Sequence, residues 1–264
     1  MNGFDPNLLS LIEDASLNAS APPQQRWLDG WLLRFNPGKA KRARCVNAVA
    51  TGRLPVADKL QRAQALFAEM GLPLVVRITP FTQPAHLDAE LAALGLGTLD
   101  DTRVLVNLQL PAAVAADTAV PSGLVWQALP PADYAEAVGQ LRGSPAAQRA
   151  AHAERLLASP VPYQGFAWVR ASDGQVQCCG QFAREAEFVG LYDVFTRPEA
   201  RGQGLAASLC QRLLGIAVAQ GARVGYLQVE HDNPARRIYE RLGFAEGYRY
   251  HYREWPVAEA GQGA

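Results

Sequence analysis

The stretch FTRPEARGQGLAASL, residues 195–209, constrains the fold more than any other part of this 264-residue chain. A strand-like run leads through a short charged segment to Gly202 and Gly204, and an apolar-periodic segment follows directly. Glycine is costly inside a helix but well tolerated at its entrance, so the pattern predicts a strand, a glycine loop and a helix. Because the N–H groups at a helix entrance are free, this is a site for an anion.

The composition argues against several classes of partner. The chain has 25 lysine and arginine residues and 25 aspartate and glutamate residues, so its formal net charge is zero. This balance argues against nucleic acid or a membrane surface as the main partner. The first residues lack a basic segment, so we expect no signal peptide. A membrane-spanning helix needs about 20 apolar residues, and no apolar run approaches this length, so we expect no membrane helix.

The four cysteines, Cys45, Cys178, Cys179 and Cys210, form no C-x-x-C pair. This spacing argues against a zinc site or a disulfide framework. We therefore expect no bound metal, and reduced thiols in the cytoplasm.

Residues 111–123, PAAVAADTAVPSG, are small, bracketed by prolines and without periodicity, which is typical of a linker. We therefore predict two domains, over residues 1–115 and 120–255, and a frayed tail over 258–264. In the first half, the patterns predict helices over 6–19, 56–70 and 84–94 and strands over 30–36, 42–51, 72–81 and 102–110.

In the second half, the patterns predict strands over 123–129, 165–171, 175–183, 187–196, 223–230 and 248–254, and helices over 131–141, 145–158, 205–220 and 234–242. Asp173 and Gly174 have the residue types of a tight hairpin turn. The order of elements is about the same in both halves, which indicates a diverged internal duplication. The predicted fold class is α/β in the wider sense (α+β), with mixed, mostly antiparallel sheets flanked by helices.

The glycine loop also fits a rival motif. Gly202-x-Gly204-x-x-Ala207 matches the dinucleotide fingerprint, and Glu230 lies at the end of the next predicted strand. However, residues 196–201 separate the strand from the first glycine, and the unit comes late in the chain, after antiparallel hairpins. Both features disfavour a nicotinamide or flavin site. A P-loop is excluded because no Gly-Lys-Ser/Thr follows.

Two blocks together resemble the GNAT superfamily of acetyltransferases. Its acetyl-CoA-binding motif, Arg/Gln-x-x-Gly-x-Gly/Ala after a strand-ending proline, is similar to Pro198, Arg201, Gly204 and Ala206. A second block about 30 residues later, NPARRIYERLGF, carries the family's other pattern. Its matching residues are Asn233, Ala235, Tyr239, Gly243 and Phe244. The resemblance covers residues 123–254. The first half resembles a degenerate GNAT copy, since its loop TQPAHLDAEL has no glycine and no arginine.

The resemblance implies acetyl-CoA as co-substrate, bound in the C-terminal half. The residues implied to cradle its pyrophosphate are Arg201, Gly202, Gln203, Gly204, Leu205 and Ala206. The strands ending at Thr196 and Glu230 are then expected to splay for the pantetheine, with N–H groups near Val194 and Thr196 pairing with its amides. The Val194 N–H is expected to polarise the thioester carbonyl. Asn233 matches the family asparagine that bonds pantetheine, and its alternative role is a helix N-cap.

The resemblance also implies direct acetyl transfer in a ternary complex. Tyr239 matches the family tyrosine that protonates the leaving thiolate, although it also lies on an apolar stripe. The candidates for the general base are Asp193, Glu187, Glu230, His231 or a water chain, with Glu230 and Asp193 placed first. In the first half, Trp31, Arg34 and Arg44 are candidates for acceptor recognition, or else ordinary sheet residues.

The expected function is acetylation of the primary amine of a small molecule, an amino acid or an amino-acid-like compound. Two alternatives stay open: an acyl-CoA-binding sensor without turnover, and acetylation of a protein amine. The sequence leaves the oligomeric state open between a monomer and a homodimer.

Overall fold

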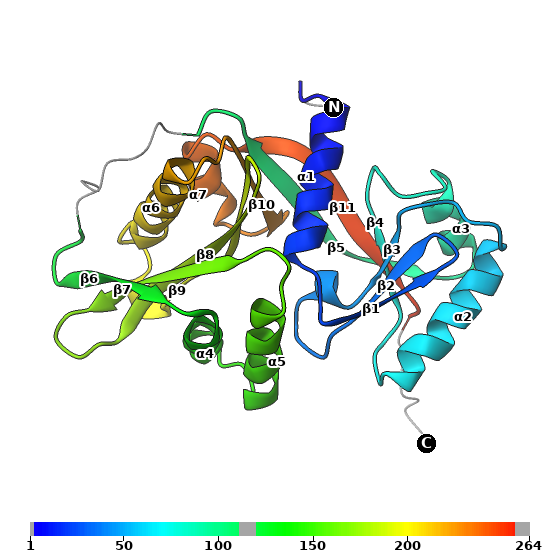
Figure 1. Ribbon diagram of the computed structural model, residues 1–264, viewed down its shortest axis with the longest axis horizontal. Helices are drawn as coiled ribbons and strands as arrows, with labels where there is room; N and C mark the ends of the chain where they lie inside the picture. Colours follow the sequence, from blue (N-terminus) through cyan, green and yellow to red (C-terminus); the bar gives the residue numbers. More distant parts are fainter. Residues whose placement is uncertain (1–2, 111–119, 257–264) are drawn as a thin grey trace, which may run out of the picture. The chain divides into compact units, whose positions relative to one another are not determined.

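The computed structural model describes residues 3–110 and 120–256 of the chain (Figure 1). The chain divides into two compact units. The larger unit contains the residues up to Pro23 together with Arg103–Tyr248, and the smaller unit contains Gln24–Thr102 and the residues from Arg249 onward. Most of the predicted linker and all of the predicted tail, residues 258–264, lie outside the described residues.

The larger unit is built on a mixed, mostly antiparallel sheet with the strand order β6-β7-β8-β9-β10-β5-β11. Adjacent strands from β6 to β9 are antiparallel, and β9 and β10 are parallel. The strands are β6 (Leu124–Leu129), β7 (Tyr163–Arg170), β8 (Val176–Glu185), β9 (Phe188–Thr196), β10 (Val224–Glu230), β5 (Gly97–Asn107) and β11 (Ala245–Glu254). The residues of β5 before Arg103 and those of β11 after Tyr248 belong to the smaller unit.

The hairpin between β7 and β8 confirms the predicted turn. The Gly174 N–H donates to the Arg170 carbonyl oxygen at 2.9 Å, and the Arg170 N–H donates to the Gln175 carbonyl oxygen at 2.9 Å. Gly174 has a φ of +72°, a conformation that glycine adopts without strain. The loop therefore spans residues 171–174, and the Asp-Gly pair forms its second half.

Helices cover both faces of this sheet. They are α1 (Pro6–Ala19), α4 (Pro131–Leu141), α5 (Ala146–Leu157), α6 (Leu205–Ala219) and α7 (Arg236–Arg241). Helix α6 lies on one face of β7–β9, and α4 and α5 lie on the other (Figure 1). The apolar stripe of α6 buries Leu205, Leu209 and Leu213 against the sheet, as its periodicity predicts. Gly180 allows this close approach, because a Cβ there would lie 2.5 Å from the Leu209 side chain.

The smaller unit has the strand order β1-β2-β3-β4-β11. Its elements are β1 (Gln24–Leu28), β2 (Trp31–Phe35), the 3-10 turn η1 (Lys41–Ala43), β3 (Val46–Ala48), α2 (Val56–Glu69), β4 (Val75–Ile78) and α3 (Leu87–Ala93). Strands β3 and β4 are parallel, and the other pairs are antiparallel. One strand, β1, was not predicted from the sequence, because its residues QQRWL are mostly polar and exposed.

Each compact unit is assembled from two separate stretches of the chain. Helix α1 belongs to the larger unit, and so does the second half of β5, which lies between β10 and β11. The end of β11 pairs with β4 in the smaller unit, with Tyr252 opposite Arg77. Each half of the sequence therefore contributes a segment to the other half's compact unit. None of the helices in the described part of the chain has the length and apolar character needed to cross a bilayer.

Candidate active site

The parallel strands β9 and β10 separate before they end. Their paired register runs from Phe188 opposite Val224 to Leu191 opposite Leu227, and no later pair is formed. Strand β9 nevertheless continues to Thr196. The two strands therefore diverge toward their carboxyl ends, as predicted. This divergence exposes backbone N–H and C=O groups on both strands to a ligand.

An irregularity in β9 lies at the start of this divergence. The pairing of β8 with β9 shifts register between Cys179 and Gln181, so that Asp193 and Val194 together oppose the single residue Gly180. Asp193 has a φ of 52°, which is rare for a residue other than glycine. This geometry is a β-bulge, and bulges redirect the backbone next to functional sites. The peptide N–H predicted to polarise the thioester, that of Val194, lies directly at the bulge.

Four side chains hold Asp193 in this conformation. Arg142 Nη1 donates to one carboxylate oxygen at 3.0 Å, and Gln181 Nε2 donates to the other at 2.9 Å. His152 Nε2 lies 3.3 Å from that second oxygen. The Tyr134 hydroxyl donates to the Asp193 backbone carbonyl at 2.8 Å. Helices α4 and α5 and strand β8 therefore all contact the bulge residue.

This environment makes Asp193 a weak proton acceptor. Burial alone would raise the pKa of the Asp193 carboxyl, but the positive charge of Arg142 and the nearby His152 outweigh it and hold the pKa well below its usual range. A carboxylate that remains ionised and bonded to Arg142 and Gln181 is poorly suited to take a proton from an ammonium group. Its contacts suit a structural role at the bulge.

The glycine loop has the geometry of an anion cradle. Gly202 and Gly204 have φ values of +77° and +75°, and a Cβ built on either would meet no atom within 4 Å. Gly204 is the N-cap of α6 and offers no side chain to the first turn. The N–H groups of that turn have no partner within the helix. The helix entrance is therefore open, and it presents donors at the positive end of the helix dipole.

The other loop residues flank this entrance. Gln203 is exposed, Leu205 is buried in the core, and Ala206 packs against the edge of that core. Arg201 is exposed, its Nε donates to the Thr196 carbonyl at 3.3 Å, and its guanidinium lies 5.7 Å from the centre of the Phe195 ring. These contacts hold the arginine against the end of β9, beside the loop.

The side chain of Thr196 points into the protein core. Its hydroxyl lies 3.2 Å from the sulfur of the buried Cys178. The side chain of Val194 packs against the same core cluster. Both residues therefore have their backbone groups, and not their side chains, available at the diverging strand.

Tyr239 lies on α7 and is 9 % exposed. Its ring belongs to the core cluster and lies 6.4 Å from that of Phe244, in an edge-on arrangement. Burial raises the pKa of the Tyr239 hydroxyl far above its ordinary value. The hydroxyl therefore stays protonated at any physiological pH and is able to act as a proton donor.

Helix α7 begins later than the sequence predicts. Its N-cap is Ala235 and not Asn233. Asn233 instead accepts a hydrogen bond from the Ala235 N–H through Oδ1 at 2.9 Å, the pattern of an Asx turn. The Arg236 N–H donates to the Asn233 carbonyl at 3.0 Å, so a tight turn precedes the helix. Within the part of the chain that the structure describes, the Nδ2 group of Asn233 makes no hydrogen bond, so it is available as a donor.

The two base candidates at the end of β10 lie in different surroundings. Glu230 is the exposed last residue of the strand. The neighbouring His231 accepts a hydrogen bond from Arg103 Nε through Nδ1 at 3.2 Å. Arg103 also lies 3.4 Å from Glu246. Sequence reasoning missed Arg103 because it lies on β5, far away in the chain. Glu187 lies at the opposite end of β9, before its first residue, so the structure does not bring it to the diverging strands.

A second group that sequence reasoning missed comes from α1. Glu13 is buried, and it accepts a hydrogen bond from the Tyr248 hydroxyl at 2.6 Å. The Gln228 side chain of β10 donates to the hydroxyl of Ser16. Glu13 and Ser16 share the buried face of α1 with Leu9 and Ile12, so polar residues within that apolar stripe were the available signal.

Trp31 does not serve as an acceptor contact, because it is fully buried in the core of the smaller unit, with Lys59 Nζ 4.9 Å from its ring centre. Arg34 is buried and Arg44 is partly exposed in the same unit. All four cysteines are free and buried. Within residues 3–110 and 120–256, no group of three or more His, Cys, Asp or Glu side chains is arranged to hold a metal ion.

Comparison with known proteins agrees with this geometry. Residues 136–244 match the acetyltransferase (GNAT) family model. No curated protein matches the chain. A GCN5-related N-acetyltransferase from Kribbella flavida has a TM-score of 0.67 at 17% identity, over 95% of this chain and 96% of that one. A tandem GNAT protein from the clavulanic acid biosynthesis pathway has a TM-score of 0.62 at 19% identity, over 79% of this chain and 70% of that one. At these identities the structural likeness concerns the fold alone.

Proposed function

Because residues 136–244 belong to the GNAT acetyltransferase family, we propose that this protein transfers an acetyl group from acetyl-CoA to the primary amine of a small molecule, an amino acid or an amino-acid-like compound. The observation that carries the proposal is the divergence of β9 from β10 beyond Leu191 and Leu227, next to the open glycine entrance of α6. The balanced charge of the chain also favours a small acceptor over nucleic acid. The four buried thiols fit a reducing compartment, and we place the protein in the cytoplasm.

The loop residues hold the pyrophosphate in this proposal. The N–H groups from Arg201 to Ala206 face the anion at the positive end of α6, and the Arg201 side chain adds charge beside it. The open space at Gly202 and Gly204 fits this role, because a side chain at either position would project into the place of the phosphate.

The diverging strands hold the pantetheine and the acetyl group. We assign the backbone groups of Val194 and Thr196 and the Nδ2 group of Asn233 to the pantetheine amides. The Val194 N–H polarises the thioester carbonyl, and an oriented donor of this kind contributes about 100- to 1000-fold in rate. The bulge at Asp193 determines the direction of that N–H, so we assign Asp193 to positioning and no longer to proton transfer.

Two side chains move protons in the proposed reaction. The acceptor nitrogen forms a bond to the acetyl carbon, and the carbon–sulfur bond breaks. The Tyr239 hydroxyl, which burial keeps protonated, gives its proton to the departing thiolate. The nitrogen loses its second proton as the amide forms, and that proton returns through solvent to the Tyr239 phenolate. Glu230, or a water chain that ends at it, accepts the proton from the acceptor ammonium.

The test is a free-thiol release assay with acetyl-CoA against a panel of amino acids, polyamines and aminoglycosides. Thiol release with one class of acceptor supports the enzyme and identifies that class. Tight acetyl-CoA binding without release across the panel would favour a sensor or a protein amine as acceptor. Absence of acetyl-CoA binding would contradict the proposal altogether.

A further inference from the structure

An open cavity of about 1180 Å³ adjoins the glycine loop within the larger unit. Its walls come from the start of β6, the β7–β8 hairpin and the segment between β9 and α6. Gln203 and Leu205, the residues on either side of Gly204, both line it. The cavity also reaches Gln177 on β8, so it extends from the loop away from β10. A ligand bound at the entrance of α6 is therefore able to continue into this cavity.

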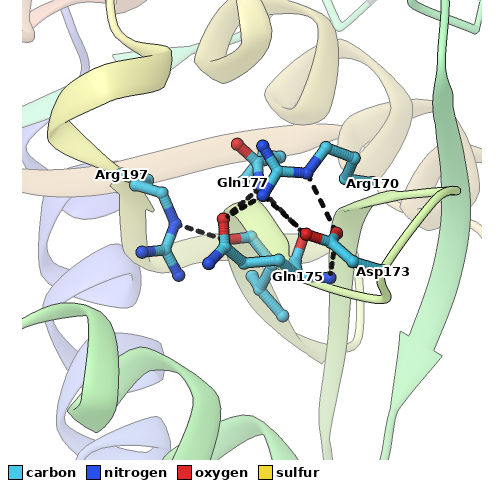
Figure 2. A network of polar contacts seen from close by, with 6 residues as sticks. Arg170, Asp173, Gln175, Gln177 and Arg197 are labelled. Atoms are coloured by element: carbon cyan, nitrogen blue, oxygen red, sulfur yellow. Dashed lines mark hydrogen bonds and ion pairs between the residues drawn. The ribbon is translucent and has the colours of Figure 1, made fainter.

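A hydrogen-bond network fixes the hairpin wall of the cavity, as Figure 2 shows. Arg170 bonds both oxygens of Asp173, through Nε at 2.9 Å and Nη2 at 2.7 Å. The same Nη2 donates to the Gln175 side-chain oxygen at 2.6 Å, and Gln177 Nε2 donates to the Gln175 backbone carbonyl at 3.0 Å. The charge of Arg170 is thus largely compensated by Asp173. This wall is polar, and its side chains are linked by hydrogen bonds to one another.

Arg197 differs from Arg170 in having no carboxylate partner among the described residues. Its backbone N–H donates to the Gln177 carbonyl at 2.9 Å, and its Nε donates to the Val176 carbonyl at 3.0 Å. Both bonds hold the arginine at the cavity wall and orient its guanidinium. In Figure 2 the two terminal nitrogens point away from the network. Arg197 therefore offers a fixed pair of charged donors, the geometry that phosphate groups require.

One acidic residue, the exposed Glu199, also lines the cavity. Its charge opposes that of Arg197 and weakens the attraction for an anion. Removal of the Arg197 charge should therefore lower the affinity for an anionic ligand, and removal of the Glu199 charge should raise it.

We infer that this cavity receives the 3′-phosphoadenosine end of acetyl-CoA and that Arg197 binds the 3′-phosphate. The inference rests on the proposed function. The pyrophosphate joins pantetheine on one side to the phosphorylated nucleoside on the other. With the pyrophosphate at the α6 entrance and pantetheine between β9 and β10, the nucleoside leaves the loop on the other side. The cavity lies there, with polar walls and an oriented arginine.

The experiment compares CoA with 3′-dephospho-CoA by titration calorimetry. The wild-type protein is expected to bind CoA about tenfold more tightly, the ratio expected for one partly solvated charge-assisted contact. In Arg197→Gln this ratio is expected to fall close to one, with affinity for 3′-dephospho-CoA unchanged. A ratio equal to that of the wild type would overturn the inference.

A second variant tests the same contact without touching the hairpin. Glu199→Gln removes the opposing charge from an exposed residue, so it is expected to raise the affinity for CoA about two- to threefold and to leave 3′-dephospho-CoA unaffected. Glu187→Gln is the matched control, because it makes the same charge change at an exposed residue before the start of β9. If both variants raised the affinity for CoA equally, the change would follow from the net charge of the protein alone. That outcome would contradict the assignment of Arg197 to the 3′-phosphate.

The two proposals fail in different ways. If CoA and 3′-dephospho-CoA both bind and no variant changes their ratio, the nucleoside lies elsewhere and the acetyltransferase proposal stands. If neither nucleotide binds to the wild-type protein, the proposed function itself fails, and this inference fails with it.

Discussion

The guanidinium of Arg142 lies 3.0 Å from the carboxylate of Asp193, at the point where β9 departs from regular pairing with β8. Helix α4 thereby fixes a residue whose own backbone conformation is unfavourable, with a φ of 52°. Strain of this kind persists only where neighbouring contacts over-determine it, and it concentrates at functional sites. The pair links the packing of a helix to the direction of the N–H group at Val194.

Replacement of this carboxylate tests that link. Asp193→Asn keeps the size of the side chain but leaves Arg142 without its counter-charge, so we expect the free energy of unfolding to fall by about 2 kcal/mol. We also expect kcat to fall more than the KM for acetyl-CoA changes. Urea denaturation and steady-state kinetics measure both effects. Asp173→Asn is the control, since its pair with Arg170 is exposed to solvent and contributes little to stability. Equal losses of stability and of kcat in the two variants would contradict a special role for Asp193.

The same pair predicts a pH dependence. The pKa of Asp193 is lower in the folded than in the unfolded protein, so its contribution to stability is present above the unfolded pKa of about 4 and is lost as the pH falls through the folded value. The difference in unfolding free energy between wild type and Asp193→Asn should be present at about pH 5 and shrink as the pH falls further, through the folded pKa. Urea titrations at a series of pH values test this. A difference that grows on acidification would contradict the sign.

Removal of the Tyr239 hydroxyl tests the proposed proton donor. In Tyr239→Phe we expect kcat to fall roughly 100-fold, the lower end for general acid catalysis, with acetyl-CoA affinity within about twofold. Because burial raises the pKa of Tyr239, the wild-type rate should show no loss from this group up to about pH 10. Tyr252→Phe, at a buried tyrosine of the smaller unit, provides the control. Unchanged turnover in Tyr239→Phe would leave the residue with a packing role only.

The role of the glycine loop is tested by the same substitution at two glycines, one at each end of α6. Gly204 and Gly221 lie at opposite ends of α6, have φ values of +75° and +100°, and both have open space around them. Replacement of either by glutamate is expected to cost about 1–2 kcal/mol through backbone strain. Only Gly204→Glu places a carboxylate at the proposed phosphate position, so only this variant should lose acetyl-CoA binding in calorimetry. Comparable binding by the two variants would refute the cradle.

The proton acceptor is tested through the pH dependence of one variant. Glu230→Gln is expected to lower kcat/KM for the acceptor amine about 10- to 100-fold near pH 7. The loss should diminish as the pH approaches the pKa of the amine, since a neutral amine needs no base. Asp232→Asn changes a neighbouring carboxylate whose side chain is 99% exposed, and it should have little effect. A loss that persists unchanged at high pH would indicate a binding role for Glu230.

The local sequence pattern was sufficient to predict most helices and strands of this protein and the glycine loop that precedes α6. Helix α1 occupies the predicted residues 6–19, and the Asp173-Gly174 turn forms where expected, because helix periodicity and turn chemistry depend on neighbouring residues. The positive φ of Gly202 and Gly204 follows from the same local rules. Strand β1 escaped prediction because its exposed, polar residues carry no alternation.

Long-range pairing decided the rest. The position of β5 between β10 and β11 brings Arg103 to His231 across 128 residues of sequence, and no local signal encodes such a neighbour. The surroundings of Asp193 likewise come from α4, α5 and β8, and they turn a candidate base into an ionised anchor. A residue's type and spacing are properties of the chain, whereas its pKa, its partners and the space around it arise only when distant segments pack together.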